Sequence, residues 1–125
     1  MKALSALACT AALAAATAHA DCTYPTAPAS LPDGRTATLE DMLAGQKAVK
    51  EYQKAIDEYV GCLDKELDSN KPKGDLNAQQ KAEVEKMSAM EAQKHNAAVD
   101  QAQAVADRFN EQVKVYKARQ ADAKK

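Results

Sequence analysis

The chain has 125 residues and a formal net charge of −1. Apolar residues make up 46% of it, but 28 of them are Ala, which adds little to a core. After the first twenty residues, Leu, Ile, Val and Phe supply 15 of 105 positions, below the range of ordinary globular domains. This composition excludes a thick globular core and leaves disorder or long helices. The content of Ala, Gln, Lys and Glu favours helices, and the near-neutral charge argues against nucleic acid as a partner.

Residues 1–20 have the pattern of a secretion signal. Lys2 gives a positive start, residues 3–17 form an apolar run, and an Ala-His-Ala sequence ending at Ala20 is of the kind that signal peptidase accepts. The run is shorter and richer in Ala than a membrane span. We therefore expect cleavage after Ala20 and a periplasmic or secreted mature protein that begins at Asp21. No transmembrane segment is expected after signal cleavage.

Two cysteines, Cys22 and Cys62, remain in the mature chain, because Cys9 leaves with the signal. Exported proteins commonly carry disulfides. The separation of forty residues excludes a C-x-x-C redox motif, and the single mature histidine, His95, is too few for a zinc site. The sequence therefore predicts a structural disulfide between Cys22 and Cys62, and no cofactor or metal.

Residues 21–37 are expected to form an extended strap. They contain three prolines within eight residues, the last of which opens a Pro-Asp-Gly turn sequence. This proline content forbids a helix and favours a polyproline-like conformation. The strap from Cys22 to Thr38 reaches about 50 Å at a polyproline rise, whereas the helix from Thr38 to Cys62 measures about 36 Å. The strap is therefore long enough to fold back along the first helix and be fastened to it.

Two long helices are expected after the strap. The first begins at Thr38, which opens a capping-box sequence, and continues to about Asp68 with apolar side chains at heptad spacing. A polar turn over residues 69–76 contains a Pro and a Gly, which end the helix. The second helix is expected from Asn77 to about Ala121, since no Gly or Pro interrupts it.

The fold expected is all-α: an antiparallel two-helix hairpin, coiled-coil-like, with the N-terminal proline-rich strap fastened by one disulfide. With the turn centred near residues 72 and 73, the numbers of facing residues add to about 145. Ile56 then faces the small side chain of Ala89. Gly61, beside Cys62, is either a place where a second backbone comes close or a simple kink in the helix.

The second helix is expected to extend beyond the first, because the two lengths are about 66 Å and 45 Å. Leu39 then lies opposite Ala106, and Phe109, Val113 and Tyr116 fall beyond the first helix. These three residues keep the spacing of a buried stripe, and they are the candidate interaction surface. We expect either the strap or a partner, another protein or a second copy in a homo-oligomer, to cover them. A partner is favoured, because the disulfide draws the strap away.

Four elements between residues 22 and 63 recur in order in a known group of proteins. The elements are Cys22-Thr23-Tyr24-Pro25, Pro32-Asp33-Gly34, Met42 and Tyr59-Val60-Gly61-Cys62-Leu63. In these the chain resembles a group of short, uncharacterised exported proteobacterial proteins with C-x-x-P, P-[DN]-G and Y-x-x-C-[LI] elements. The resemblance implies the disulfide and the periplasm. It does not extend to the second helix, and it implies no function.

Two smaller features concern charge. His95 lies on the expected seam one turn after Glu91, and a boundary histidine partly in water is favoured over a pH-sensitive core histidine. Basic residues from Lys114 onward, including the basic tail at residues 122–125, complement the dipole of a helix C-terminus. Contact of this tail with an anionic envelope lipid is a weaker alternative.

No catalytic pattern is recognisable in the mature chain, which has one histidine, no free thiol and no phosphate-binding loop. We therefore expect no enzyme, no catalytic residues and no cofactor. The function expected is that of a non-catalytic periplasmic helical-hairpin protein that binds other proteins, as an adaptor or a small chaperone-like binder. The alternative is a structural envelope protein that self-assembles through the helical seam.

Overall fold

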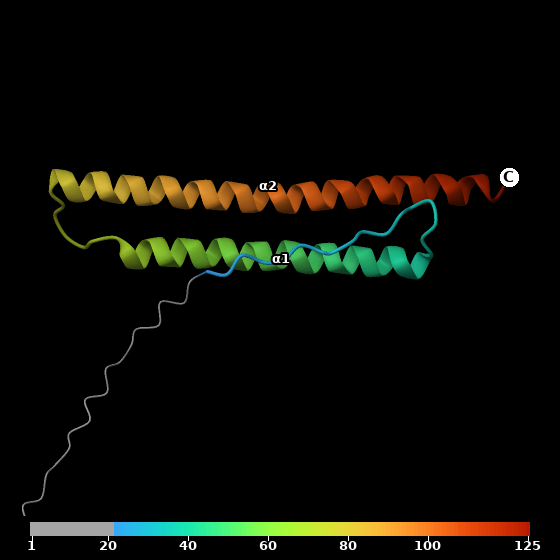
Figure 1. The fold of residues 1–125 in the computed structure, drawn as a ribbon, viewed down its shortest axis with the longest axis horizontal. Coiled ribbons are helices and arrows are strands. Elements are labelled where there is room, and N and C mark those ends of the chain that lie inside the picture. Colours follow the sequence, from blue (N-terminus) through green and yellow to red (C-terminus); the bar gives the residue numbers. More distant parts are fainter. Residues whose placement is uncertain (1–21) are drawn as a thin grey trace, which may run out of the picture.

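The computed structural model describes residues 22–125, and this part of the chain is helical without any β-strand. Helix α1 comprises Leu39–Asn70 and helix α2 comprises Ala78–Asp122. Figure 1 shows the two helices side by side, joined at one end by residues 71–77. The all-α class is confirmed. The expected signal and its cleavage site at Ala20 lie outside the described residues.

Both helices start where their capping sequences predict. Thr38 caps α1: its hydroxyl accepts a hydrogen bond from the Asp41 N–H at 3.1 Å, and its own N–H donates to the Asp41 carboxylate at 2.8 Å. Asn77 and Gln80 make the corresponding reciprocal pair at α2, at 2.9 Å and 3.0 Å. Such pairs satisfy backbone N–H groups that have no partner within the helix. The helix ends lie one or two residues beyond the expected positions, because no side chain forces a sharp stop there.

The core is a single seam between the helices. Ile56 and Leu63 of α1 and Val105 of α2 are each 2% exposed and are the most deeply buried large side chains in residues 22–125. The seam alternates large and small side chains, which lets the two backbones approach closely. Its buried members are Met42, Val49, Tyr52, Ile56, Leu63, Ala98, Ala102, Val105 and Phe109.

The predicted register between the helices is wrong. Gly45 lies against Phe109, and Leu67 and Ser88 line a common hollow, so the numbers of facing residues add to about 154 rather than 145. Figure 1 gives the reason: α2 extends beyond α1 at both ends, and the connection therefore does not turn midway between the helices. The longer helix, α2, therefore overhangs α1 at both ends. With this register, Ile56 comes opposite Ala98 instead of Ala89.

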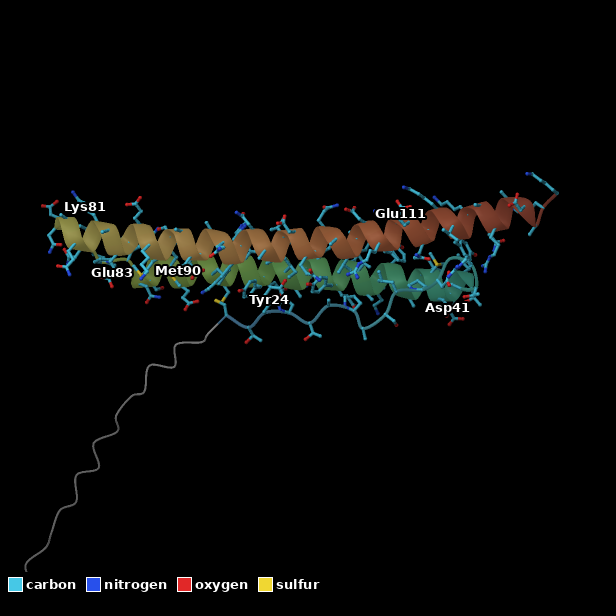
Figure 2. All side chains as sticks on the ribbon, turned by 45° about the horizontal axis from the view of Figure 1, so that its top comes forward. Tyr24, Asp41, Lys81, Glu83, Met90 and Glu111 are labelled. Atoms are coloured by element: carbon cyan, nitrogen blue, oxygen red, sulfur yellow. A yellow bond between two sulfur atoms is a disulfide. The ribbon has the colours of Figure 1, made fainter. Side chains whose placement is uncertain are left out.

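Residues 22–38 form an N-terminal segment that lies on one side of the helix pair. Figure 2 shows it running beside α1, with Tyr24 near its start. Ala27 and Leu31 pack against the core from this segment, and Ala37 is buried in it. Neither helix carries an apolar stretch that is long enough to cross a membrane, for the residues that the structure describes.

Candidate functional site

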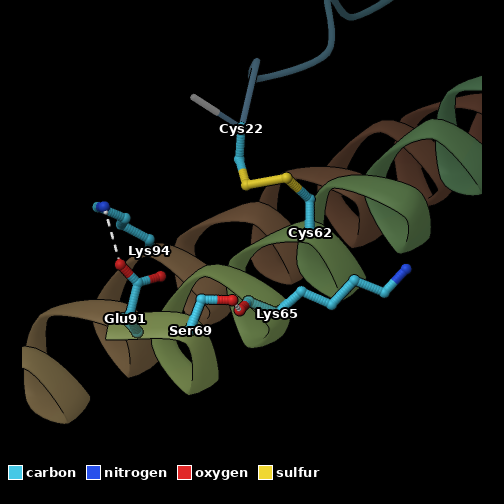
Figure 3. Close-up of a disulfide and its surroundings, with 6 residues drawn as sticks. All are labelled: Cys22, Cys62, Lys65, Ser69, Glu91 and Lys94. Atoms are coloured by element: carbon cyan, nitrogen blue, oxygen red, sulfur yellow. Dashed lines mark hydrogen bonds and ion pairs between the residues drawn. A yellow bond between two sulfur atoms is a disulfide. The ribbon is translucent and has the colours of Figure 1, made fainter. Parts of the chain in front are cut away.

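A disulfide joins the start of the N-terminal segment to the C-terminal third of α1. Cys22 and Cys62 are bonded with their Cα atoms 5.8 Å apart, across 40 positions of sequence. Figure 3 shows this bond as the link between the segment and the helix. The predicted pairing of Cys22 with Cys62 is confirmed.

Three tyrosines gather next to the disulfide. The rings of Tyr24 and Tyr59 meet edge to face with centroids 5.1 Å apart, a favoured arrangement of aromatic pairs. Beneath them, Tyr52 is 4% exposed and its hydroxyl has no hydrogen-bond partner of ordinary geometry. Burial raises the pKa of Tyr52 to about 12, with a smaller contribution from the Tyr24 hydroxyl. The N-terminal segment thus helps to keep this hydroxyl away from water.

Arg119 of α2 holds the other end of the N-terminal segment. Its guanidinium donates hydrogen bonds to the carbonyl oxygens of Arg35, at 2.6 Å, and of Ala37. It also lies over the ring of Tyr116, 5.1 Å from the centroid, within the range of a cation–π interaction. Interaction with the helix dipole, expected for the basic residues of this region, is therefore not the only role of Arg119. This contact has no signal in the sequence, because only the fold brings residues 35–37 to α2.

Residues 28–37 of the N-terminal segment lie over a groove whose walls belong to α1 and α2, and we call it the covered groove. The Gly34 N–H donates a hydrogen bond to the side-chain oxygen of Gln112 at 2.9 Å. A Cβ at Gly34 would overlap the backbone carbonyl oxygen of Gln112. Glycine is therefore required at this point for the backbones to meet. The covered groove is formed by Ala44, Gly45, Ala48, Val105, Gln112 and Val115.

The glycine of α1 that a neighbouring segment approaches closely is Gly45 and not Gly61. A Cβ at Gly61 would meet no atom within 4 Å, so of the two alternatives for this residue the close approach of a second backbone is wrong. At Gly45, by contrast, a Cβ would lie 2.6 Å from Pro32 Cδ and 3.0 Å from Phe109 Cε2. Gly45 leaves room for both side chains, and no sequence signal distinguished it from Gly61.

The candidate interaction surface is largely inside the molecule. Phe109 is 6% exposed, and Val113 and Tyr116 are half-buried against the same core. The preference for a partner as the cover of Phe109 is therefore wrong. The register near 154 brings α1 beside Phe109, and Pro32 of the N-terminal segment closes over Gly45 next to it.

A shallow hollow of about 260 Å³ lies near the connected ends of the helices. His95 and Glu91 line it together, and both are half-buried. One oxygen of the Glu91 carboxylate pairs with Lys94 at 3.0 Å, whereas the other has no hydrogen-bond partner; Figure 3 shows this ion pair. The hydrogen bond to Glu91 raises the pKa of Lys94. No group of three metal-binding side chains gathers here or elsewhere in residues 22–125.

The exposed faces carry a few large apolar side chains among many charged ones. Leu39 and Leu43 are 60% and 57% exposed and lie one turn apart at the start of α1. Met90 and Val99 of α2 are also largely exposed. These side chains offer contact area to another molecule without any rearrangement of the core.

Much of the positive charge of the C-terminal region is already paired. Lys114 lies 2.7 Å from the Glu111 carboxylate, and Lys125 lies 3.3 Å from that of Asp122. Arg119 is bound to backbone carbonyls. The field that an anionic lipid would meet is therefore weaker than the sequence alone suggests.

Comparisons with known proteins add no assignment. No protein-family model, no curated protein and no solved structure matches this chain. The arguments below therefore rest on the residues and their geometry.

Proposed function

We propose that the protein is an exported antiparallel helical hairpin, with a proline-rich strap, that binds other proteins without catalysing a reaction. Its role is that of an adaptor or a small chaperone-like binder. The observation that carries this proposal is the exposure of Leu39 and Leu43, one turn apart on a helix that is otherwise charged on its outer side. Exposed apolar side chains in contiguous positions are typical of interaction sites.

Self-assembly through the helical seam has less support. The seam residues Val49, Ile56 and Val105 are at most 5% exposed within a single chain, so a second copy finds them occupied. An association of copies would have to use other side chains, among which Leu39 and Leu43 again offer the largest exposed apolar contacts on α1.

Suppression of client aggregation tests the proposal. The oxidised protein is mixed with a test enzyme that aggregates on heating, and light scattering is followed at increasing molar ratios. We expect the wild-type chain to reduce scattering, and Leu39→Gln with Leu43→Gln to lose most of this effect while keeping its helical circular dichroism. The matched control, Lys47→Gln with Glu51→Gln, changes two exposed polar side chains of α1, 78% and 68% exposed, and should protect like wild type.

Two results contradict the proposal: a wild-type chain without protection at any ratio, or equal protection by the leucine variant. Export is tested separately by the intact mass of the protein from a periplasmic extract. We expect a chain that begins at Asp21 and gains two hydrogens on reduction, because the cysteines form one disulfide.

A further inference from the structure

The two halves of the N-terminal segment are attached to the helices in different ways. From residue 33 onward, the segment has directional polar contacts: Gly34 donates to Gln112, and the carbonyls of Arg35 and Ala37 accept from Arg119. Among the described residues, no hydrogen bond within the usual limits of distance and angle joins residues 22–32 to either helix. Their attachment consists of apolar packing and the Cys22–Cys62 disulfide.

The packing of residues 22–32 leaves space on both sides. A hollow of about 620 Å³ lies between Pro28–Pro32 and α2, where Val105 and Val115 line it. A second hollow, of about 470 Å³, lies between Ser30–Pro32 and α1. Both hollows are open to solvent, so residues 28–32 contact the helices along a narrow strip between two surface hollows. These residues therefore lie on the covered groove as a bound peptide does, with Leu31 and Pro32 turned to the helices.

The covered groove already shows which kind of chain fits it. Its present occupant is extended and offers small or apolar side chains, Ala27, Leu31 and Pro32, to the helices. On the α1 side the groove is made of small residues, Ala44, Gly45 and Ala48, so that an extended backbone can approach this helix closely. On the α2 side it is lined by larger side chains, including Val105, Gln112 and Val115. A partner segment with an apolar residue followed by proline has the same chemistry and a low entropic cost of ordering.

We propose that residues 22–32 are an intramolecular ligand of the covered groove, that reduction of the Cys22–Cys62 disulfide by a dithiol releases them, and that the freed groove binds an extended, apolar, proline-containing segment of another protein. This deepens the proposed binding function and rests on it. In the redox step the dithiol attacks the S–S bond through a mixed disulfide. The S–S bond breaks, the two cysteine sulfurs gain two electrons and two protons as thiols, and the dithiol closes to its own disulfide.

Peptide binding as a function of redox state tests this inference. The probe is a fluorescein-labelled synthetic peptide with the sequence of residues 22–34 and Ser in place of Cys22. Its affinity is measured by fluorescence anisotropy for the oxidised chain, for the chain reduced with a dithiol, and for Cys22→Ser with Cys62→Ser. We expect the last two to bind the probe at least tenfold more tightly than the oxidised chain.

A glycine pair provides a matched control for the location of the site. In the double-serine background, Gly45→Ala places a methyl group where Pro32 lies and should weaken probe binding. Gly61→Ala places a methyl group in open space on the same helix and should leave probe binding unchanged. Equal effects of the two alanines on probe binding would contradict the assigned groove.

A second variant covers the case in which loss of the disulfide unfolds the chain, which circular dichroism would reveal. Tyr24→Ser with Leu31→Ser keeps the disulfide and removes apolar contacts of the segment, so it should also bind the probe more tightly than wild type. Native helicity without any gain in probe binding, in the reduced chain or in this variant, overturns the inference. If the oxidised chain still protects a heat-denatured client through Leu39 and Leu43, only this inference has failed; without that protection the proposed function has failed as well.

Discussion

At the scale of single residues, Gly45 and Gly61 differ only in their surroundings. Both lie inside α1, where glycine is less favourable than alanine by about 1 kcal/mol. Gly45 is buried under Pro32 and against Phe109, whereas the space beside Gly61 is open. The helix tolerates one glycine because a neighbouring segment needs the space, and the other serves no contact in the structure.

We predict opposite changes in stability when each glycine is replaced by alanine. Gly61→Ala should raise the free energy of unfolding by about 0.5–1 kcal/mol, because only the backbone entropy changes. Gly45→Ala should lower the free energy of unfolding, because Pro32 and Phe109 have to move away from the new methyl group. Urea denaturation of the two variants checks this, and a Gly45→Ala chain as stable as Gly61→Ala would show that the segment yields without cost.

The capping residue Asp41 makes the start of α1 sensitive to acid. Hydrogen bonds from the Thr38 backbone N–H and then from its hydroxyl hold the pKa of Asp41 below its usual value of 3.8. Because the pKa is lower in the folded chain, the stabilisation is fully present above the unfolded pKa and is lost as the pH falls through the folded one. Acidification below about pH 4 should therefore weaken this end of the helix.

We predict that Thr38→Val raises the pKa of Asp41 only part of the way to 3.8, since the variant loses the hydroxyl but keeps the backbone N–H that contributes most. A carboxyl NMR titration measures this shift. Thr36→Val, at an exposed position outside the cap, is the control and should leave the pKa of Asp41 where it is. An unchanged pKa in Thr38→Val would mean that the hydroxyl does not stabilise the carboxylate.

Among the residues, those with a local signature were predictable from the sequence. Thr38 and Asn77 cap their helices with side chains three positions away, and Cys22 and Cys62 are the two cysteines of the described residues and are bonded to each other. The partners of Arg119 are more than 80 positions away, and those of Gly45 are Pro32, 13 positions away, and Phe109, 64 positions away. Their roles depend on which segments the fold brings together, and a local pattern contains no such information.

At the scale of elements, Arg119 joins the C-terminal part of α2 to the N-terminal segment. It binds two backbone carbonyls that no helix satisfies and stacks on Tyr116. Hydrogen bonds from charged donors contribute more than neutral ones. The contact therefore fixes residues 35–37 against α2 just before the chain turns into α1.

We predict that Arg119→Gln lowers the free energy of unfolding by about 2 kcal/mol and speeds amide exchange at residues 33–38, while α1 and α2 keep their protection. Hydrogen exchange followed by mass spectrometry measures this. Lys117→Gln, which also removes a positive charge but at an exposed position, should leave exchange at residues 33–38 unchanged. Equal acceleration in both variants would attribute the effect to net charge and not to the contact.

The lengths and ends of both helices followed from periodicity and capping, but their register did not. Residues 71–77 have no repeating pattern that fixes how far the chain travels between the helices, and their one positive φ, at Gly74, is a local feature. The register is set where Gly45 accepts Phe109. The residue numbers of facing residues add to about 154 instead of 145, and this difference of nine places Phe109 in the core and not in an overhang.

At the scale of the whole molecule, the protein is a rod of two helices with one additional layer on one side. Its composition was informative here: few large apolar residues sufficed because the core is one narrow seam. A rod of this kind has much surface for its volume. The added segment and its disulfide compensate in part, since closing a loop of 40 residues contributes about 4 kcal/mol by the chain-entropy estimate.

The position of the disulfide also determines how the molecule carries mechanical load. A pull applied between Cys22 and the C-terminus passes through the two sulfurs directly into α1 at Cys62, about three quarters of the way along the helix. The 40 positions from Cys22 to Cys62 are thereby bypassed, and with them the capped start of α1 and the Gly45 contact. Full extension of the oxidised chain should fall short of that of the reduced chain by about 140 Å, at about 3.5 Å for each bypassed residue. The force is borne by the last quarter of α1, after Cys62, and by α2, so oxidation turns one end of this rod into a mechanically protected loop.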